Sequence, residues 1–241
     1  MKLSIIIPFY QNERKLSSCL ASLAKQTVFD DFAAEVEVII INDGGEAQNY
    51  AEDYAELRGR VKNLIFYNIS HVGAAGARNF GWQKTSGEFI FFCDADVIFL
   101  KNDALEKMIK VLSENPVVAF CYSSFKFGWK KFPGVEFDAV KLKKNNYIST
   151  MSLIRREWLQ KISPDRPWDE NLKRFQDWDL WLSLVEKGGK GIMLPEFLWQ
   201  ASGGTMSKWL PSFFYKIFKN NNRVKKYEEA KTIIMEKHNL K

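Results

Sequence analysis

Two aspartates in the string Asp94-Ala95-Asp96 are the side chains of this sequence best suited to chemistry. They directly follow an apolar run, so their carboxylates would lie together at the end of a strand. Carboxylates in this arrangement can share a hard divalent cation, which keeps some waters and takes its other ligands from a diphosphate. The same string is also an ordinary acidic turn after a strand, and the pattern alone leaves both interpretations open.

Two other polar segments follow apolar runs in the same way. Pro8-Phe9-Tyr10-Gln11-Asn12-Glu13 comes at the end of the first run, and Asn42-Asp43-Gly44-Gly45 at the end of the second. In open α/β sheets, ligands bind at the carboxyl ends of the strands, where the connecting loops leave a crevice. We therefore expect both segments and the aspartate pair to lie at one edge of a sheet.

Apolar runs alternate with helical repeats along the first half of the chain. The first runs are rich in isoleucine, which is typical of strands buried on both faces of a parallel sheet. Between the runs, apolar side chains recur three and four residues apart, which indicates helices. The alternation predicts an α/β fold with a mostly parallel central sheet flanked by helices. Strands are predicted at 3–9, 36–41, 63–69, 88–93 and 117–122, helices at 12–25, 47–55, 74–84, 103–113 and 175–187, and a hairpin or long loop at 125–134.

The composition limits what kind of protein this is. A chain of 241 residues with 46% hydrophobic content can bury one sizeable core but not two large domains. Its three cysteines are separated in sequence and have apolar neighbours, which predicts buried free thiols without a disulfide or zinc framework. No run reaches the roughly 18 apolar residues of a membrane span, so we expect a cytoplasmic protein. The net charge of +6 favours anionic partners.

Three familiar protein classes do not fit the sequence. The first predicted strand leads into Pro8-Phe9-Tyr10-Gln11, not into the glycine fingerprint of a dinucleotide-dependent dehydrogenase. The glycine-lysine loop of P-loop kinases and NTPases is missing as well. The positive charge comes without a recognisable nucleic-acid-binding module, so we expect no nucleic-acid partner.

Four segments of the first 100 residues resemble glycosyltransferase family 2, and they occur in the order and spacing of that family. The resemblance implies the GT-A fold, a nucleotide-binding α/β sandwich. It also implies transfer of a sugar from a nucleotide-diphosphate donor, as in polysaccharide biosynthesis. The segments are SIIIPFYQNE at 4–13, VIIINDG at 38–44, GAAGARNFG at 73–81 and SGEFIFFCDAD at 86–96.

The resemblance also implies how the donor would be held. Pro8 and Tyr10 would line the pocket for the base, with Glu13 near it. Asp43 would contact the base or the ribose, and His71, which replaces a frequent asparagine, fits a surface or packing role better than a phosphate contact.

Residues of the third and fourth segments would contact the diphosphate and the sugar. Asp94 would contact the donor sugar or ribose, and Asp96 of this DXD motif would bind a divalent metal, Mn2+ or Mg2+. Arg78 and Asn79 would lie close to the diphosphate. A guanidinium at position 78 suits a phosphate and a structural salt bridge to Asp94 or Asp43 equally well, and both roles can coexist.

Asp177 is the predicted catalytic base. An inverting transfer needs a group that takes a proton from the acceptor hydroxyl as that hydroxyl attacks the anomeric carbon. The segment RFQDWDLWL at 174–182 is similar to the acidic motif of the family at the start of a helix below the acceptor site. An aspartate in a first helical turn is also favourable simply through the helix dipole. Asp179 should point to another face and be solvated.

Besides His71, the sequence departs from the family pattern at four positions. Val97 stands where a third acidic residue is frequent, and Gln176 where glutamate is usual. Gln200 and Ser202 stand where an arginine and a metal-binding histidine often occur. Because serine is a far weaker ligand than imidazole, a metal would depend on Asp96, phosphate oxygens and water.

The second half should supply the acceptor site. Most of its tryptophans should be core residues, and Trp178 and Trp199 are the two expected to contact an acceptor glycan. The aromatic and basic segment 208–226 fits either an interfacial helix on anionic lipid or a helix packed on the sheet with snorkelling lysines. The expected parts are a donor-binding half at 1–122, an acceptor-binding half of the same domain at 123–207, and a helical tail at 208–241.

Taken together, the sequence predicts a metal-dependent, inverting glycosyltransferase with a nucleotide-diphospho-sugar donor and a glycan or lipid-linked acceptor. It would be cytoplasmic, with peripheral membrane contact through 208–226 as an open alternative. The competing hypothesis is a catalytically silent relative that binds nucleotide sugar or glycan, which Val97, Gln176 and Ser202 motivate.

Overall fold

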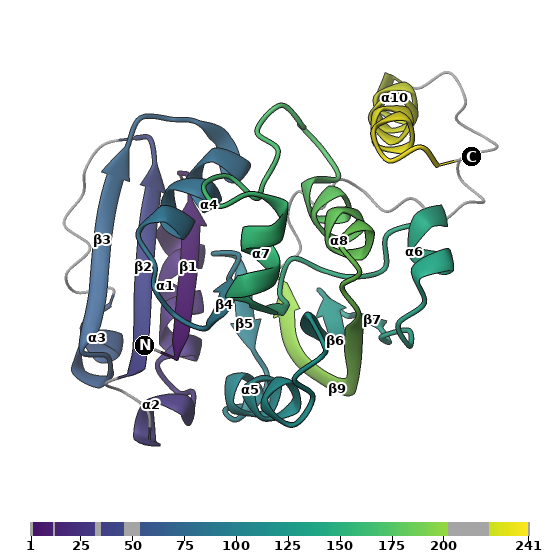
Figure 1. Ribbon diagram of the computed structural model, residues 1–241. Helices are drawn as coiled ribbons and strands as arrows, with labels where there is room; N and C mark the ends of the chain where they lie inside the picture. The colour runs from purple at the N-terminus through teal and green to yellow at the C-terminus, as the bar shows by residue number, and fades with distance from the viewer. Residues whose placement is uncertain (1, 12, 32–34, 46–53, 202–221, 241) are drawn as a thin grey trace.

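The protein is a mixed α/β sandwich, seen in a computed structural model (Figure 1). The structure describes all residues except 1, 12, 32–34, 46–53, 202–221 and 241. Within this part of the chain, nine strands form one sheet in the order β3-β2-β1-β4-β8-β6-β9-β5, and β7 pairs with β6. The strands are β1 (Leu3–Phe9), β2 (Val36–Asp43), β3 (Asn63–Ile69), β4 (Phe89–Phe92), β5 (Val97–Phe99), β6 (Phe120–Phe127), β7 (Lys130–Phe132), β8 (Leu153–Arg155) and β9 (Gly191–Ala201).

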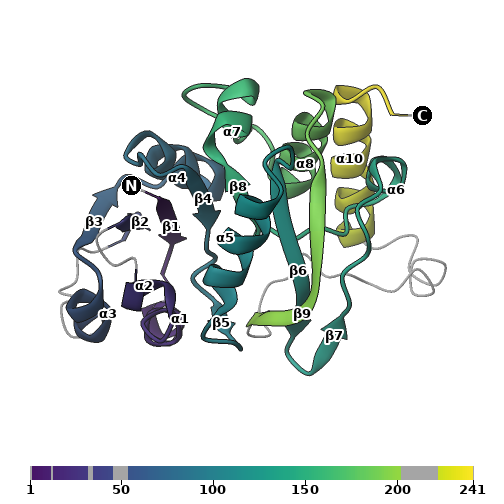
Figure 2. The same ribbon diagram turned by 60° about the horizontal axis from the view of Figure 1, so that its bottom comes forward.

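Helices cover both faces of the sheet, which Figure 2 shows edge-on. One face carries α1 (Glu13–Leu23), α2 (Val28–Asp31), α3 (Ala55–Arg60) and α5 (Ala104–Glu114). The other carries α4 (Gly73–Gln83), α6 (Ala139–Lys144), α7 (Arg156–Ile162), α8 (Gln176–Glu186) and α10 (Asn222–Lys237).

The central strands are buried on both faces, as their isoleucine-rich runs predict. In β1, Ile5 and Ile7 join one hydrophobic cluster while Ile6 joins the cluster on the opposite face. Residues of β2 alternate between the clusters in the same way, and the whole strand is buried. Strands β3, β2, β1 and β4 are parallel neighbours, so their carboxyl ends meet at one edge of the sheet.

The second half of the sheet is mixed, which refines the expectation of a mostly parallel sheet. Strand β8 runs antiparallel to both β4 and β6, and β5 runs antiparallel to β9, whereas β6 and β9 are parallel. Of the two alternatives for 125–134, a hairpin or a long loop, the structure has the hairpin, made of β6, a turn at Gly128-Trp129, and β7. The expected boundary between residues 122 and 123 lies inside β6, and the same sheet continues on both sides of it.

Most predicted elements are confirmed within a few residues, with one clear shift. The strand expected at 117–122 begins only at Phe120, because Asn115-Pro116 starts a turn that leaves Val117 exposed. The helix expected at 47–55 lies mostly outside the described residues, and α3 begins at Ala55. All three cysteines are buried and free, as expected.

The C-terminal helix α10 packs beside α8, and its contacts overturn the expectation that Asp179 is solvated (Figure 2). Asp179 is buried, and its Oδ1 lies 2.8 Å from His238 Nε2 and 2.7 Å from Lys237 Nζ. The other ring nitrogen of His238 lies 2.7 Å from Glu186 Oε1. Asp179 is therefore the buried anchor of the C-terminal helix. The part of the predicted tail at 208–221 lies outside the described residues.

Two carboxylates face the two ring nitrogens of His238, so the ring must be protonated to donate both hydrogen bonds. Burial by itself lowers the pKa of His238, but the hydrogen bonds to Asp179 and Glu186 outweigh it and raise the pKa above its ordinary value. A raised folded-state pKa means that this stabilisation is complete below the unfolded-state pKa of about 6.5 and is lost as pH rises through the folded-state pKa.

We therefore predict that His238→Gln lowers the free energy of unfolding by about 2–3 kcal/mol near pH 6 and by less near pH 9. Urea denaturation at both pH values measures the difference from wild type. Lys226→Gln, an exposed change on the same helix, is the matched control and should have little effect at either pH. A deficit that does not change with pH would show that His238 is not protonated in the folded protein.

Within the part of the chain that the structure describes, no helix combines the length and apolar character needed to cross a membrane.

Candidate functional site

The three polar segments picked out from the sequence lie together at the carboxyl ends of β1, β2 and β4, as predicted. These strands are parallel neighbours, and they end at Phe9, Asp43 and Phe92 (Figure 1). Pro8 is half-buried and opposite Ile41 in the ladder, whereas Tyr10 is 45% exposed just beyond the strand end. Glu13 is half-buried in the first turn of α1.

Tyr10, His71 and Asp43 form one contact group at the β1–β2 end of this edge. The rings of Tyr10 and His71 are stacked, with centroids 4.3 Å apart. His71 Nδ1 lies 3.1 Å from Asp43 Oδ2 and 2.8 Å from the Asp43 backbone oxygen. Asp43 Oδ1 accepts a hydrogen bond of 2.7 Å from the backbone N–H of Val72. The carboxylate is thus held firmly, and an exposed aromatic surface lies next to it.

Gly44 makes this arrangement sterically feasible. Its φ is +96°, a left-handed conformation that favours glycine, and a Cβ added there would lie 2.8 Å from His71 Cβ. The sequence placed Asp43 in the site and favoured a surface or packing role for His71 over a phosphate contact. The ring of His71 packs on Tyr10 and against Asp43, and contact with a phosphate stays a prediction.

Arg78 and Asp94 form a salt bridge of 2.8 Å, which confirms the structural alternative for Arg78. Arg78 is 8% exposed, and its guanidinium lies 4.7 Å above the ring of Trp168 and donates a hydrogen bond of 3.4 Å to Gln176 Oε1. Gln176 also donates to the carbonyl of Leu172, so the amide serves two protein contacts. Arg78 thereby joins the end of β4 to the start of α8. Contact with a phosphate stays a prediction.

Asp96 is partly exposed and lies close to two other charged groups, Lys15 and Asp94. Its side chain is 33% exposed and lies 3.8 Å from Lys15 Nζ. Burial, and then the neighbouring Asp94, raise the pKa of Asp96, because both disfavour its negative charge. A divalent cation would relieve that repulsion, and carboxylate oxygens are the ligands that Mg2+ and Mn2+ prefer.

The described residues contain no cluster of three or more histidine, cysteine, aspartate or glutamate side chains that could hold a metal. Asp94 and Asp96 offer two carboxylates, so a cation bound there would take its other ligands from a diphosphate and water. Val97 begins β5 and is buried, and Gln200 lies opposite Ile98 in the β5–β9 ladder. Ser202 lies outside the described residues.

Asp177 lies in the first turn of α8, close enough to the Arg78–Asp94 pair for both charges to affect it. Burial raises the pKa of Asp177; Arg78 acts in the opposite direction and Asp94 in the same direction. Its Oδ2 accepts a hydrogen bond of 2.8 Å from Asn146 Nδ2, and its Oδ1 accepts one of 2.9 Å from the Trp178 backbone N–H. Asn146 was missed from the sequence because it lies in a loop without a recognisable motif.

Three other predicted residues have their side chains engaged inside the protein. Asn79 is buried, donates to Trp168 O and Glu170 Oε1, and accepts from the Trp168 N–H. Trp178 is 1% exposed and donates to the Leu142 carbonyl, and Trp199 is 4% exposed and stacks on Phe125. Neither tryptophan presents a ring face to a bound glycan in this structure, because the core covers both rings.

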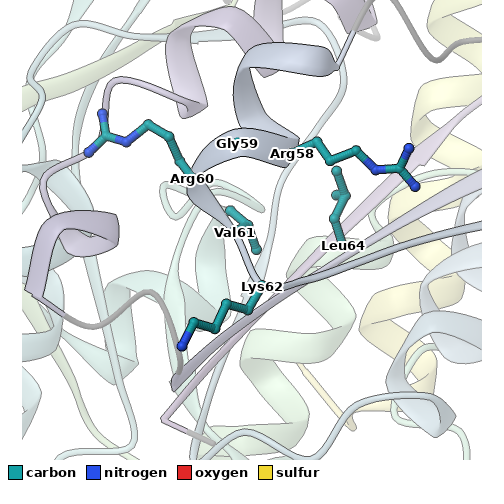
Figure 3. A pocket seen from close by; sticks show the side chains of 6 residues that line it. All are labelled: Arg58, Gly59, Arg60, Val61, Lys62 and Leu64. Carbon is teal, nitrogen blue, oxygen red and sulfur yellow. The ribbon is translucent and has the colours of Figure 1, made fainter.

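A hollow of about 410 Å³ elsewhere in the molecule is unrelated to this edge (Figure 3). It is lined by Arg58–Lys62 and Leu64, at the amino end of β3, and the site lies at the carboxyl ends of the same parallel strands. Arg60 is already bound there to Asp30 and to the Ala24 carbonyl.

Known proteins similar to this chain are glycosyltransferases. An uncharacterized glycosyltransferase of Rickettsia bellii is 27% identical over 205 residues, which are 77% of this chain and 26% of that protein. The crystal structure of S. aureus TarS 1–349 with UDP-GlcNAc is 22% identical, with a TM-score of 0.69 over 90% of this chain and 64% of the TarS 1–349 chain. The mannosyltransferase PcManGT of Pyrobaculum calidifontis, in complex with GDP-Man and Mn2+, is 15% identical, with a TM-score of 0.63 over 97% of this chain and 69% of that one.

The solved structures and the family model support different conclusions about this chain. At their low identity, the two solved structures establish the fold, which is the predicted GT-A fold. The chain spans about a quarter of the length of the Rickettsia relative. The family itself rests on the match to Glycosyl transferase family 2 over residues 4–163, a range that holds all four motif segments. Because this match covers more than half of the chain, the protein belongs to glycosyl transferase family 2.

Proposed function

We propose that this protein transfers a sugar from a nucleotide-diphosphate donor to an acceptor hydroxyl, with inversion at the anomeric carbon. The observation that carries the proposal is the meeting of Asp94, Arg78 and Asp177 at one edge of the sheet. The donor side of this edge comes from the first half of the chain, and the base comes from α8. A glycan or a lipid-linked glycan is the proposed acceptor.

The donor would lie along the ends of β1, β2 and β4. The exposed ring of Tyr10 offers a stacking surface for a base, and Asp43 is fixed beside it by His71 and Val72. Arg78 holds Asp94 in one orientation, so Asp94 can accept hydrogen bonds from hydroxyls of the donor without rearranging. Relatives in fold bind UDP-GlcNAc and GDP-Man, which supports a nucleotide-sugar donor without selecting the base.

A divalent cation, Mn2+ or Mg2+, held by Asp96 would neutralise charge that develops on the leaving diphosphate. The repulsion between Asp94 and Asp96, which a cation would relieve, supports this assignment, and PcManGT is described in complex with Mn2+. The proposal requires only one or two protein ligands, because the diphosphate supplies others.

Asp177 is the proposed general base. Its two hydrogen-bond donors, Asn146 and the Trp178 N–H, fix the orientation of the carboxylate and leave lone pairs free for an acceptor hydroxyl. Burial raises the pKa of Asp177 toward physiological pH. A base whose pKa lies nearer the working pH takes up a proton more readily. The proton of the acceptor hydroxyl would go to Asp177 while the oxygen attacks the anomeric carbon.

We predict that Asp177→Asn lowers the turnover number by about 10²- to 10⁴-fold and leaves donor affinity nearly unchanged, because an amide cannot accept the proton. Release of nucleoside diphosphate measures turnover, and calorimetry with a nucleoside diphosphate measures binding. Asp165→Asn, an exposed change outside the site, is the control. If wild type binds nucleotide but turns over no donor, the catalytically silent relative is the correct description.

We further predict that Mn2+ increases the thermal stabilisation given by UDP or GDP, and that Asp96→Ala removes this increase. Loss of a direct ligand should weaken metal-dependent nucleotide binding by at least about tenfold. Thermal shift with each nucleotide, with Mn2+ or with EDTA, measures the effect, and Asp165→Ala serves as the matched control. The same Mn2+ effect in Asp96→Ala and wild type would exclude Asp96 as the ligand.

A further inference from the structure

The most exposed large apolar side chain among the described residues is Trp129, at the tip of the β6–β7 hairpin. It is 90% exposed, whereas Trp168, Trp178, Trp181 and Trp199 are all buried in the core. Tryptophan exposed to this extent is uncommon, because its large apolar surface is costly to leave in water. Its indole ring suits an interface that is apolar on one side and wet on the other.

The Trp129 hairpin, defined as residues 126–132, is strongly basic. It contains Lys126, Lys130 and Lys131 and no acidic residue. Lys126 and Lys131 lie directly opposite each other in the ladder, an arrangement that destabilises a hairpin unless an anion compensates it. None of the three lysines forms a salt bridge with any residue that the structure describes. Lys130 Nζ lies 5.9 Å from the ring of Trp129.

The hairpin is firmly held, so this exposure is a property of an ordered element. Phe125 stacks on Phe132 across the two strands at 5.0 Å, and on Trp199 of β9 at 4.6 Å. Gly128, with φ +54°, forms the tight turn, and its N–H donates a hydrogen bond of 3.0 Å to the carbonyl of Ala201. The aromatic stack anchors one side of the hairpin and leaves the tip to project from the molecule.

The tip lies near the aspartate pair. Ala201, which bonds to Gly128, is opposite Val97 in the β5–β9 ladder, and Val97 directly follows Asp96. Two steps between neighbouring strands separate Gly128 from Val97, a distance of about 10 Å. Whatever the hairpin contacts is therefore brought close to the aspartate pair.

We propose that the Trp129 hairpin is a docking surface for an anionic lipid membrane. The indole would enter the interface while the three lysines contact negatively charged headgroups, which supply the counter-charge that the hairpin lacks. This goes beyond the proposed function, since binding to a membrane needs no turnover. It also gives a lipid-linked acceptor a route to the site.

Sedimentation of the full chain with vesicles tests the proposal. Wild type should bind vesicles of equal parts phosphatidylglycerol and phosphatidylcholine, should bind pure phosphatidylcholine weakly, and should lose binding as salt is raised. The double variant Lys130→Glu with Lys131→Glu should reduce partitioning by at least about tenfold. Trp129→Ala should reduce it by about tenfold.

Matched controls lie at the other end of the same strands. Lys187→Glu with Lys190→Glu makes the same charge change just before β9 begins, about 35 Å from the end of that strand that lies next to the hairpin. Val117→Ala removes an exposed apolar side chain just before β6 begins. Neither should reduce binding as strongly as the hairpin variants. Circular dichroism checks that every variant is folded.

Three results would overturn the proposal: no binding of wild type to anionic vesicles, full binding of both hairpin variants, or equal losses in the controls. A hairpin-dependent interaction with a soluble polyanion such as polyphosphate, without vesicle binding, would also overturn it and would assign the surface to a soluble polyanion. Because the measurement involves no sugar donor, its failure is distinct from a failure of the proposed function.

Discussion

The salt bridge between Arg78 and Asp94 is the interaction on which the arrangement of the site depends. A guanidinium that is almost fully buried must have compensating partners, and Arg78 has the carboxylate of Asp94, the amide of Gln176 and the face of Trp168. Its Nε is buried with no hydrogen-bond partner among the described residues. Removing one partner of such a pair costs about 3–5 kcal/mol, because the remaining charge stays buried. This penalty keeps the end of β4 and the start of α8 together.

The segment between α7 and α8 owes its position to the same neighbourhood. Asn79, next to Arg78 on α4, forms hydrogen bonds with both backbone groups of Trp168, and Trp168 in turn lies under the guanidinium. On the far side, Lys237 of α10 reaches both Asp169 of this segment and Asp179 of α8. The helix that carries Asp177 is thus fixed from its amino end by α4 and from its outer face by α10.

Features of the fold and the site that depend on residues close together in sequence could be predicted, and those that depend on distant residues could not. Strands β1 and β2 can be predicted from their sequences, because a strand buried on both faces is apolar at nearly every position. Strand β8 is three residues long and carries no periodic signal, so the antiparallel half of the sheet could not be predicted. In the site, motif residues such as Asp43 and Asp94 were identified by resemblance. Asp179 was misjudged because its partner, His238, lies 59 residues away in sequence.

The tryptophans show the same limit on the acceptor side, where proximity to a motif was a poor guide. Trp178 and Trp199 adjoin motif positions, but helix and strand geometry turns both rings into the core. Trp129 adjoins no motif, yet the β5–β9–β6 ladder places it near Asp96, because hydrogen-bonded strands carry distant residues to the same level of the sheet. Lys126 opposite Lys131 places two like charges together, although Lys131 Nζ also lies 5.9 Å from the ring of Phe197. An anionic surface outside the chain would offset the repulsion between these two lysines, which is the role that the proposed membrane contact gives to it.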